Sequence, residues 1–384
     1  MKTKQLYYED SGIKEFTACV LSCTQYGDSF CVVLDKTAFF PEGGGQCADV
    51  GTIGDANVLD VQIENDEIVH YVDREVSDEV LCKLDWMTRF TRMQNHTAEH
   101  IISGIIHNTF GLDNIGFHLS NESITCDYNG DLNWEQLKEI EVLANKYVFE
   151  SIPVEISSPT NLENLEYRSK LDLAEGVRLV TISGVDCCAC CAPHVKHTGE
   201  IGLIKIVNFE RAHHGTRLHL RCGFLALADY DEKQDNILRI CELLSARQYE
   251  TADCVEQLQR ANSQLKFDMG KASERLAEMK LQTIDKTTEN LVVELDNANK
   301  EALLTLANGG KEKTTGLFVA LTKQDDGYRY MITSGTSLPL SKIAKDINLC
   351  LNGKGGGKDD MIQGSFETTK EIIDEFFRNF TPNV

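Results

Sequence analysis

The sequence lacks the hydrophobic features that would send the chain to a membrane or out of the cell. The N-terminus, MKTKQLYYEDSG, has no apolar core after its lysines, so we expect no secretory signal. No run of about 18 apolar residues occurs, which argues against a membrane-spanning helix. With 42% hydrophobic and 26% charged residues, the composition is that of a soluble globular protein, and we expect a cytoplasmic location.

Positive charge is also scarce. The chain has 38 Lys and Arg against 60 Asp and Glu, which gives a formal net charge of −22. This balance argues against broad, non-specific binding to nucleic acid. Residues 311–358 differ, with eight Lys or Arg and four acidic residues. A local positive face is one interpretation of that segment, and a chance fluctuation is the other.

Two catalytic signatures are absent. The stretch PEGGGQ at 41–46 lacks the Gly-Lys-Ser/Thr of a P-loop, so nucleotide hydrolysis is disfavoured. Thr97 follows His96 where a His-Glu-x-x-His zinc peptidase needs glutamate. The 14 cysteines, in a chain for which we expect no export signal, favour a reducing compartment with some thiols on metal over a disulfide framework.

Four segments differ in their patterns, and together they predict an α+β multidomain chain. Residues 1–87 are rich in β-branched and aromatic runs broken by glycine, which indicates a small β-barrel or sandwich. Residues 88–227 mix helical and strand patterns. Residues 286–384 alternate strands and helices, which indicates a small α/β domain, and we interpret NGKGGGKDD within it as a glycine loop.

The remaining segment, 228–285, has no proline and a single glycine. Apolar residues recur in it with a heptad period, with Val255 at an a position and Leu258 at a d position. Asn262 occupies an a position, where it fixes register in coiled coils. We therefore predict a coiled-coil-like helix that makes a homodimer through 230–283. The alternative is a long helix that packs on its own chain.

Two pairs of metal-ligand side chains stand at suggestive spacings. His96 and His100 are four apart in a helical stretch, where side chains stack about 5–6 Å apart and reach one zinc ion. Cys190 and His194 form a second pair near Pro193. Together they supply the four N and S ligands that zinc prefers. The neighbouring thiols leave the ligand choice open, and a thiol redox pair is an alternative; they are Cys187, Cys188 and Cys191.

Several stretches together resemble the AlaX family of standalone alanyl-tRNA editing proteins and the matching editing domain of alanyl-tRNA synthetase. A further stretch, GKGGGKDDMIQG at 353–364, resembles the DHH-associated C-terminal domain that ends those synthetases. The resemblance covers nearly the whole chain in the family's order. The four stretches of the editing part are FFPEGGGQCADVG at 39–51, QNHTAEHIISG at 94–104, GFHLSNESITCDY at 116–128 and CCAPHVKHTGEIG at 190–202.

The resemblance implies a β-barrel followed by an α+β editing domain, and Zn²⁺ held by His96, His100, Cys190 and His194. The implied activity is ATP-independent hydrolysis of the ester that joins a wrong amino acid, chiefly serine and also glycine, to alanine tRNA. The C-terminal domain implies contact with the tRNA body. Because a synthetase activation domain would need a long segment ahead of residue 1, we expect editing in trans.

Two departures from the family pattern lie beside the expected metal. The family often has Cys-Gly-Gly-Thr-His where this chain has CCAPH at 190–194. The synthetase editing domain has threonine before the second histidine, where this chain has Glu99. Both changes affect the expected amino-acid preference more than the reaction class.

The polar residues beside the expected ligands, Gln94, Thr97 and Glu99, are our candidates for contacts with the hydroxyl of serine; helix capping or support of the metal ligands is the alternative. A tRNA-binding scaffold with a purely structural zinc site is the rival function. The expected tRNA and substrate contacts, for which plain turns, flexible loops or a solvated edge strand are the alternatives, are Gly43, Gly44, Gly45, Gln46, Gly116, Phe117, His118, Arg217, Lys354, Gly355, Gly356, Gly357 and Lys358.

Overall fold

The computed structural model describes residues 2–119, 124–162, 165–169, 177–212 and 215–381. It is a mixed α+β chain with several sheets, divided into two compact units, Met1–Leu238 and Arg239–Val384. Residues 120–123 of the stretch GFHLSNESITCDY lie outside the described residues. Within the described residues, none of the helices has the length and apolar content needed to cross a membrane.

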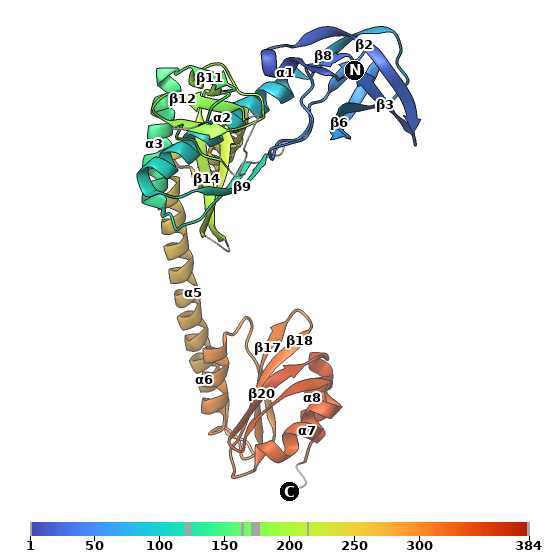
Figure 1. Cartoon of the computed structure of the whole chain (residues 1–384). Coiled ribbons are helices and arrows are strands. Elements are labelled where there is room, and N and C mark those ends of the chain that lie inside the picture. The colour runs from blue at the N-terminus through green and yellow to red at the C-terminus, as the bar shows by residue number, and fades with distance from the viewer. Residues whose placement is uncertain (1, 120–123, 163–164, 170–176, 213–214, 382–384) are drawn as a thin grey trace. The chain divides into compact units, whose positions relative to one another are not determined.

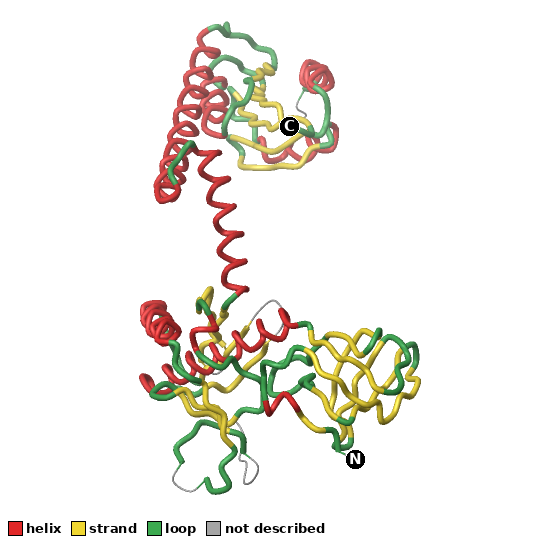
Figure 2. Tube along the Cα trace, turned by 90° about the horizontal axis from the view of Figure 1, so that it is seen from above, coloured by secondary structure: helices red, strands yellow, loops and turns green. Residues whose placement is uncertain are grey.

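The first unit begins with six strands that pair in a closed ring (Figure 2). Each strand has two hydrogen-bonded neighbours, so no edge is left open, and small and β-branched side chains such as Val32, Val58 and Val61 fill the interior. The short elements β1 (Lys4–Gln5), α1 (Leu6–Glu9) and β4 (Lys36–Thr37) lie beside the ring. In spatial order the strands are β2 (Glu15–Tyr26), β3 (Ser29–Leu34), β7 (Glu67–Val72), β6 (Ala56–Glu64), β5 (Gly51–Ile53) and β8 (Glu79–Leu84).

Helix α2 (Trp86–Phe110) is the central element of the rest of this unit (Figure 1). Asp85 caps its start by accepting a hydrogen bond from Thr88 N, and Gly111, with φ 67°, ends it in the left-handed conformation. A buried ion pair joins the helix to the ring: Arg89 Nη2 lies 2.8 Å from Asp49 Oδ2, and both side chains are 1% exposed. The helix is therefore fixed in rotation against the ring.

Two sheets and a second helix enclose α2. One sheet has four antiparallel strands and the other has three, and α3 (Trp134–Glu150) shares the hydrophobic core that α2 forms with them. Along β15, buried residues alternate with partly exposed Arg217, His219 and Arg221, as expected for a strand with one solvated face. The sheets are β14 (Ile204–Ala212), β15 (Gly215–Cys222), β10 (Ile124–Tyr128) and β9 (Asn114–Leu119); and β11 (Val154–Ser157), β12 (Leu179–Ile182) and β13 (Asp186–Ala189).

The segment that the heptad pattern predicts as one long helix is interrupted. Helix α4 (Phe224–Leu244) ends at Ser245, which has φ 50°, and a short 3-10 turn (Gln248–Glu250) precedes helix α5 (Thr251–Gln282). The single-helix prediction over 228–285 is thus wrong at 245–250. The sequence has no proline or glycine at the break. Instead Ser245 adopts the left-handed conformation, which glycine or asparagine usually adopts.

The second unit places helices on both faces of a five-stranded sheet. Helices α7 (Leu340–Cys350) and α8 (Lys370–Asn379) cover one face, and α6 (Lys300–Gly310) with the end of α5 covers the other (Figure 1). Strands β16 and β17 are parallel, and the remaining pairs are antiparallel. The strand order is β16 (Leu291–Glu294), β17 (Leu317–Gln324), β18 (Gly327–Ser334), β20 (Met361–Phe366) and β19 (Gly353–Lys358).

The glycine-rich stretch GKGGGK is not a loop. It forms β19, an edge strand paired antiparallel with β20 from Gly353 to Lys358. A Cβ added at Gly355 would lie 2.3 Å from Gln363 O and 2.4 Å from Tyr330 Oη. Glycine is therefore required for this close approach, and hydrogen bonds from β20 outweigh its low strand propensity.

This contact gives a test of the fold. Gly355→Ala should destabilise the second unit by roughly 1–3 kcal/mol, because the new methyl group has no space against Gln363 and Tyr330. Gly356→Ala is the matched control, since a Cβ there meets nothing within 4 Å. It should change the free energy of unfolding by about 0.5 kcal/mol or less in urea denaturation. Equal effects of the two substitutions would contradict the strand assignment.

Candidate metal centre

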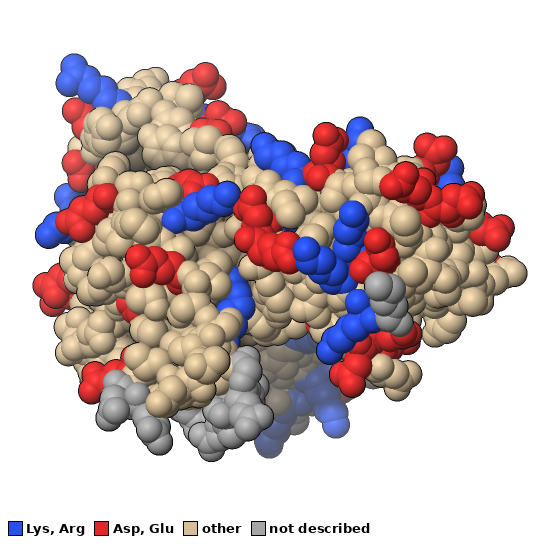
Figure 3. All heavy atoms as spheres, turned by 45° about the horizontal axis from the view of Figure 1, so that its top comes forward, with Lys and Arg blue, Asp and Glu red and all other residues tan. Residues whose placement is uncertain are grey.

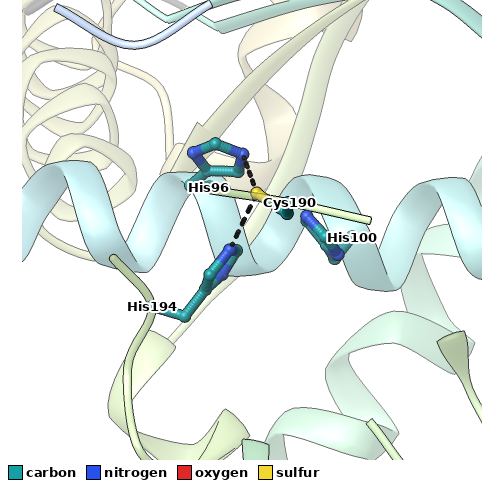
Figure 4. Close-up of side chains that lie close together, drawn as sticks. All are labelled: His96, His100, Cys190 and His194. Carbon is teal, nitrogen blue, oxygen red and sulfur yellow. Dashed lines mark hydrogen bonds between the residues drawn. The ribbon is translucent and has the colours of Figure 1, made fainter. Parts of the chain in front are cut away.

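Four potential ligand side chains converge inside the first unit (Figure 4). His96 and His100 extend from successive turns of α2, Cys190 follows β13, and His194 comes from the same loop four residues later. Their ligand atoms all lie within 4.8 Å of one another. The Cys190 Sγ atom is 3.5 Å from His96 Nε2 and 3.3 Å from His194 Nε2.

These separations suit one tetrahedral ion. A zinc ion with ordinary Zn–N and Zn–S bond lengths holds its N and S ligand atoms about 3.6 Å apart. Imidazole nitrogen and thiolate sulfur are donors that suit zinc, whereas magnesium and calcium prefer oxygen donors. The residues present therefore fit a zinc ion.

The second ring nitrogen of each imidazole is already engaged. Each Nδ1 makes a hydrogen bond to a neighbouring side chain, which fixes the ring orientation and leaves Nε2 facing Cys190. Such support is typical of metal-binding histidines. The pairs are His96 with Gln46 Oε1 at 2.9 Å, His100 with Asp186 Oδ2 at 3.0 Å and His194 with Thr97 Oγ1 at 3.0 Å.

The electrostatics of the cluster favour a thiolate. Burial alone would raise the pKa of Cys190, but the positive charge of His96 and a hydrogen bond from His100 hold it well below its usual value. Burial lowers the pKa of His194 to about 3, so that imidazole is neutral. Burial would lower the pKa of His100, but its hydrogen bonds with Asp186 and Cys190 raise it, so this imidazole must lose a proton when a metal binds.

A second possible ligand group, His100 with Asp186 and Cys188, adjoins the first. Asp186 is already engaged, because Arg168 donates to both of its oxygens at 2.7 and 2.9 Å and His100 donates to Oδ2. Burial raises the pKa of Cys188 to about 11, whereas the Cys190 Sγ atom already lies within 3.5 Å of two imidazole Nε2 atoms. The geometry therefore favours Cys190 over Cys188 as the sulfur ligand.

A cavity of about 470 Å³ opens beside the cluster. His96, His100 and Cys190 form part of its wall, so the ligand atoms border a space that is large enough for a small molecule. The other lining residues are Tyr8, Gly44, Glu99, Phe117, Ile156, Ser158, Arg168, Ser169, Arg178, Cys188, Ala189 and Cys191.

The three polar candidates on α2 have different surroundings. Glu99 lines the cavity; its Oε1 accepts hydrogen bonds from Ser103 at 2.6 Å and from Asn114, and its Oε2 lies 4.0 Å from His100 Nε2. Thr97 is fully buried and supports His194. Gln94 donates to the main-chain carbonyls of Glu200 and Ile201, and the cavity lining does not include it.

The expected substrate contacts of the glycine loop separate in the same way. Gly44 lines the cavity, whereas Gly43 and Gln46 close a tight turn through paired main-chain hydrogen bonds. Gly45, with φ 81°, lies so close to Phe117 that a Cβ would be 2.7 Å from its carbonyl oxygen. The loop thus brings Gln46 to His96, a supporting role that no spacing rule in the sequence indicates.

The remaining expected contacts lie elsewhere. Phe117 lines the cavity with its ring 4.8 Å from that of His96, while His118 on the same strand is exposed. Gly116 packs against Asp127, which accepts two hydrogen bonds from Arg217 at 2.6 and 2.7 Å. Residues 354–358 belong to the second unit. Basic and acidic groups are interspersed on the face that Figure 3 shows, without a broad positive field.

Comparison with protein families finds three matches along the chain. Residues 3–88 match the class II (A) tRNA synthetases, and residues 177–240 match the second additional domain of threonyl and alanyl tRNA synthetases. Residues 288–381 match the DHHA1 domain. Cys190 and His194 lie within the second of these regions.

Comparisons with individual proteins agree with these family matches. The chain is 26% identical to the alanyl-tRNA editing protein AlaX-L of Pyrococcus horikoshii, over 96% of each chain. It is 30% identical to the alanine–tRNA ligase of Methanopyrus kandleri over 94% of its own length, but it spans only 42% of that ligase. Among solved structures, the C-Ala domain of Aquifex aeolicus alanyl-tRNA synthetase aligns with 24% of this chain and 93% of that domain, at 15% identity; its TM-score of 0.21 supports no conclusion about the fold.

The two adjacent cysteines test the ligand set. Cys190→Ser should remove bound zinc, because Cys190 provides the only thiol of the four-residue cluster in the described part of the chain. Cys191→Ser should retain it, since Cys191 lines the cavity without belonging to the cluster. The zinc content of the purified proteins, measured by atomic emission, decides. Zinc retained by the first variant and lost from the second would contradict the assignment.

Proposed function

We propose that this chain, which belongs to the AlaX-L-like alanyl-tRNA editing proteins, hydrolyses the aminoacyl ester of mischarged alanine tRNA in trans. Serine is the expected misacyl group, and glycine is the second. The observation that carries the proposal is the cluster of three imidazoles and one thiolate, of which His96, His100 and Cys190 line a cavity of about 470 Å³. This arrangement provides a metal beside space for a small ester.

The proposal assigns a part to each segment. Residues 1–87 form the β-barrel domain, 88–227 the zinc-binding editing domain, 228–285 the helical linker, and 286–384 the DHH-associated domain that contacts the tRNA body. The family matches at 3–88, 177–240 and 288–381 support this division. Lys354 and Lys358 on the edge strand β19 are exposed and are our candidates for contact with RNA phosphates.

His96, His100, Cys190 and His194 would hold the zinc ion. When bound, zinc either lowers the pKa of a water molecule or anchors a polar group of the substrate. The chain's own contribution is to orient the ligands through Gln46, Asp186 and Thr97 and to form the cavity wall. An ester needs less activation than an amide, so this arrangement suffices for a weakly activated water.

Glu99 is the best candidate for substrate contact among the polar residues of α2. Its carboxylate lines the cavity and is oriented by Ser103 and Asn114. A carboxylate there attracts the α-ammonium group that every aminoacyl ester carries. A site whose polar groups bond the hydroxyl of serine rejects alanine, because alanine would leave those groups buried and unpaired.

The rival function is a tRNA-binding scaffold with a purely structural zinc. The complete set of four protein ligands favours it, because catalytic zinc usually keeps one position for water or substrate. The cavity at the ligand atoms favours the hydrolase, because a structural staple needs no adjoining space. Activity on mischarged tRNA separates the two.

His100→Ala tests the hydrolase. The substitution removes one ligand and exposes Asp186 to an empty space, so zinc content should fall and release of serine from Ser-tRNA(Ala) should drop at least about 100-fold. His107→Ala is the matched control, because His107 lies on the same helix and is partly exposed, outside the cluster. Ser-, Gly- and Ala-charged alanine tRNA should be compared side by side. Unchanged turnover of Ser-tRNA(Ala) by His100→Ala would contradict the proposed hydrolase function.

The homodimer remains a prediction, now confined to α5. This helix carries four heptads with apolar side chains that are exposed in the single chain, namely Val255, Leu258, Leu265, Met269, Leu276 and Met279. Leu265→Glu should convert a dimer to a monomer, whereas Gln257→Glu, at a c position, should not. Sedimentation at micromolar concentration measures the mass. A monomeric mass for the unsubstituted chain would reject the dimer.

A further inference from the structure

Arg178 lines the cavity beside the His/Cys cluster, and it has no carboxylate partner among the described residues. Arg178 precedes β12, and its Nη1 donates to the main-chain carbonyls of Cys190 at 2.7 Å and Ala192 at 3.0 Å. Its Nε is buried and has no hydrogen-bond partner in the described part of the chain. Burial lowers the pKa of Arg178, but a guanidinium stays charged at neutral pH.

The other arginine of this cavity provides a contrast. Arg168 forms two hydrogen bonds with Asp186, so its charge is compensated within the protein. No carboxylate lies within ion-pair distance of Arg178 among the described residues. Because a partly buried charge is costly unless it is paired, Arg178 is suited to an anion supplied by a ligand.

An aromatic ring stands next to this cation. Tyr8 belongs to α1, far from Arg178 in the sequence, and the centroid of its ring is 5.3 Å from Arg178 Cζ. The side chain of Tyr8 is 40% exposed and also lines the cavity. An exposed ring beside a guanidinium is a surface on which nucleobases stack in single-stranded RNA recognition.

The charges of an aminoacylated RNA end determine which part of it can bind beside Arg178 and Tyr8. The aminoacyl group carries a positive α-ammonium, which Arg178 repels and Glu99 attracts. The ester is neutral, so the phosphates are the only anions that the substrate offers. Arg178 is held against the Cys190 carbonyl, so a phosphate bound to it lies within a nucleotide's length of the metal cluster.

We infer that Arg178 binds the phosphate of the 3′-terminal nucleotide and that Tyr8 packs against its base. The inference rests on the proposed deacylase function and extends it to the nucleotide half of the substrate. Both are positioning residues: they hold the RNA end so that the ester reaches the metal cluster. Recognition of a general feature of RNA ends, rather than of alanine tRNA alone, follows from this chemistry.

Two small esters isolate the phosphate contact. In both compounds serine is esterified to a ribose hydroxyl (2′ or 3′), as in aminoacyl-tRNA. The seryl ester of AMP also carries a 5′-phosphate, and the seryl ester of adenosine lacks it. The unsubstituted protein should have a KM for the AMP ester about 10- to 100-fold lower than for the adenosine ester. Arg178→Ala should reduce this preference to near one, and Arg178→Lys should keep part of it. Titration calorimetry with AMP and with adenosine should give the same order of affinities.

Comparing the AMP and adenosine esters on the same variant separates loss of phosphate binding from general damage to the site. Arg178 also supports the loop of Cys190, so zinc content is measured for every variant, and a loss of zinc lowers turnover of both esters alike. Arg168→Lys is the matched control: it should retain the phosphate preference even if its turnover falls, because Asp186 already neutralises that position. A preference that survives Arg178→Ala would overturn the inference.

Tyr8 is tested through the base. Tyr8→Phe keeps the ring and should leave the KM for the AMP ester within about twofold, whereas Tyr8→Leu should raise it about tenfold. Equal effects of the two substitutions on the KM would show that the Tyr8 ring does not pack against the base. If the unsubstituted protein hydrolyses neither ester nor Ser-tRNA(Ala), the proposed function fails; if it hydrolyses both esters without a phosphate preference, only this inference fails.

Discussion

The buried thiolate of Cys190 between three imidazoles is the interaction on which the first unit depends. A buried negative charge is costly unless it is paired, and here the imidazoles, or a metal between them, provide the compensation. Each imidazole can face the sulfur only because its second nitrogen is bonded elsewhere. Those bonds come from the glycine loop, from strand β13 and from α2 itself, so ring, sheet and helix must all be in place before the site exists.

The buried pair of Asp49 and Arg89 makes this assembly rigid. Asp49 also accepts a hydrogen bond from Phe40 N, so one carboxylate joins both ends of the glycine loop to α2. Gly45 permits the loop to approach the carbonyl of Phe117 closely. Gln46 is thereby delivered to His96, and Gly44 to the cavity wall. The cavity wall and the position of His96 in the four-residue cluster thus depend on packing interactions outside the cluster.

The cavity has two electrostatic halves. Glu99, on the helix that carries two of the histidines, presents a carboxylate, and Arg178, held to the loop that carries the cysteine, presents a guanidinium. An aminoacyl ester of a nucleotide has the matching charges, with an ammonium at one end and a phosphate at the other. Two residues that depart from the family pattern, Glu99 and Cys191, line this same cavity.

What the sequence determined by itself is local. Histidines four apart must share one face of a helix, and Cys-x-x-x-His at a proline must bend back on itself, so the four cluster residues follow from spacing and family pattern. Helix α5 follows from its heptads. Tertiary structure decided the rest. Glycine carries no periodic signal, so only pairing with β20 makes GKGGGK a strand. The rotation of α2 against the ring turns Glu99 into the cavity and leaves Thr97 and Gln94 to bond protein groups. Tyr8 meets Arg178 only through folding, because no rule of spacing connects residues so distant in the chain.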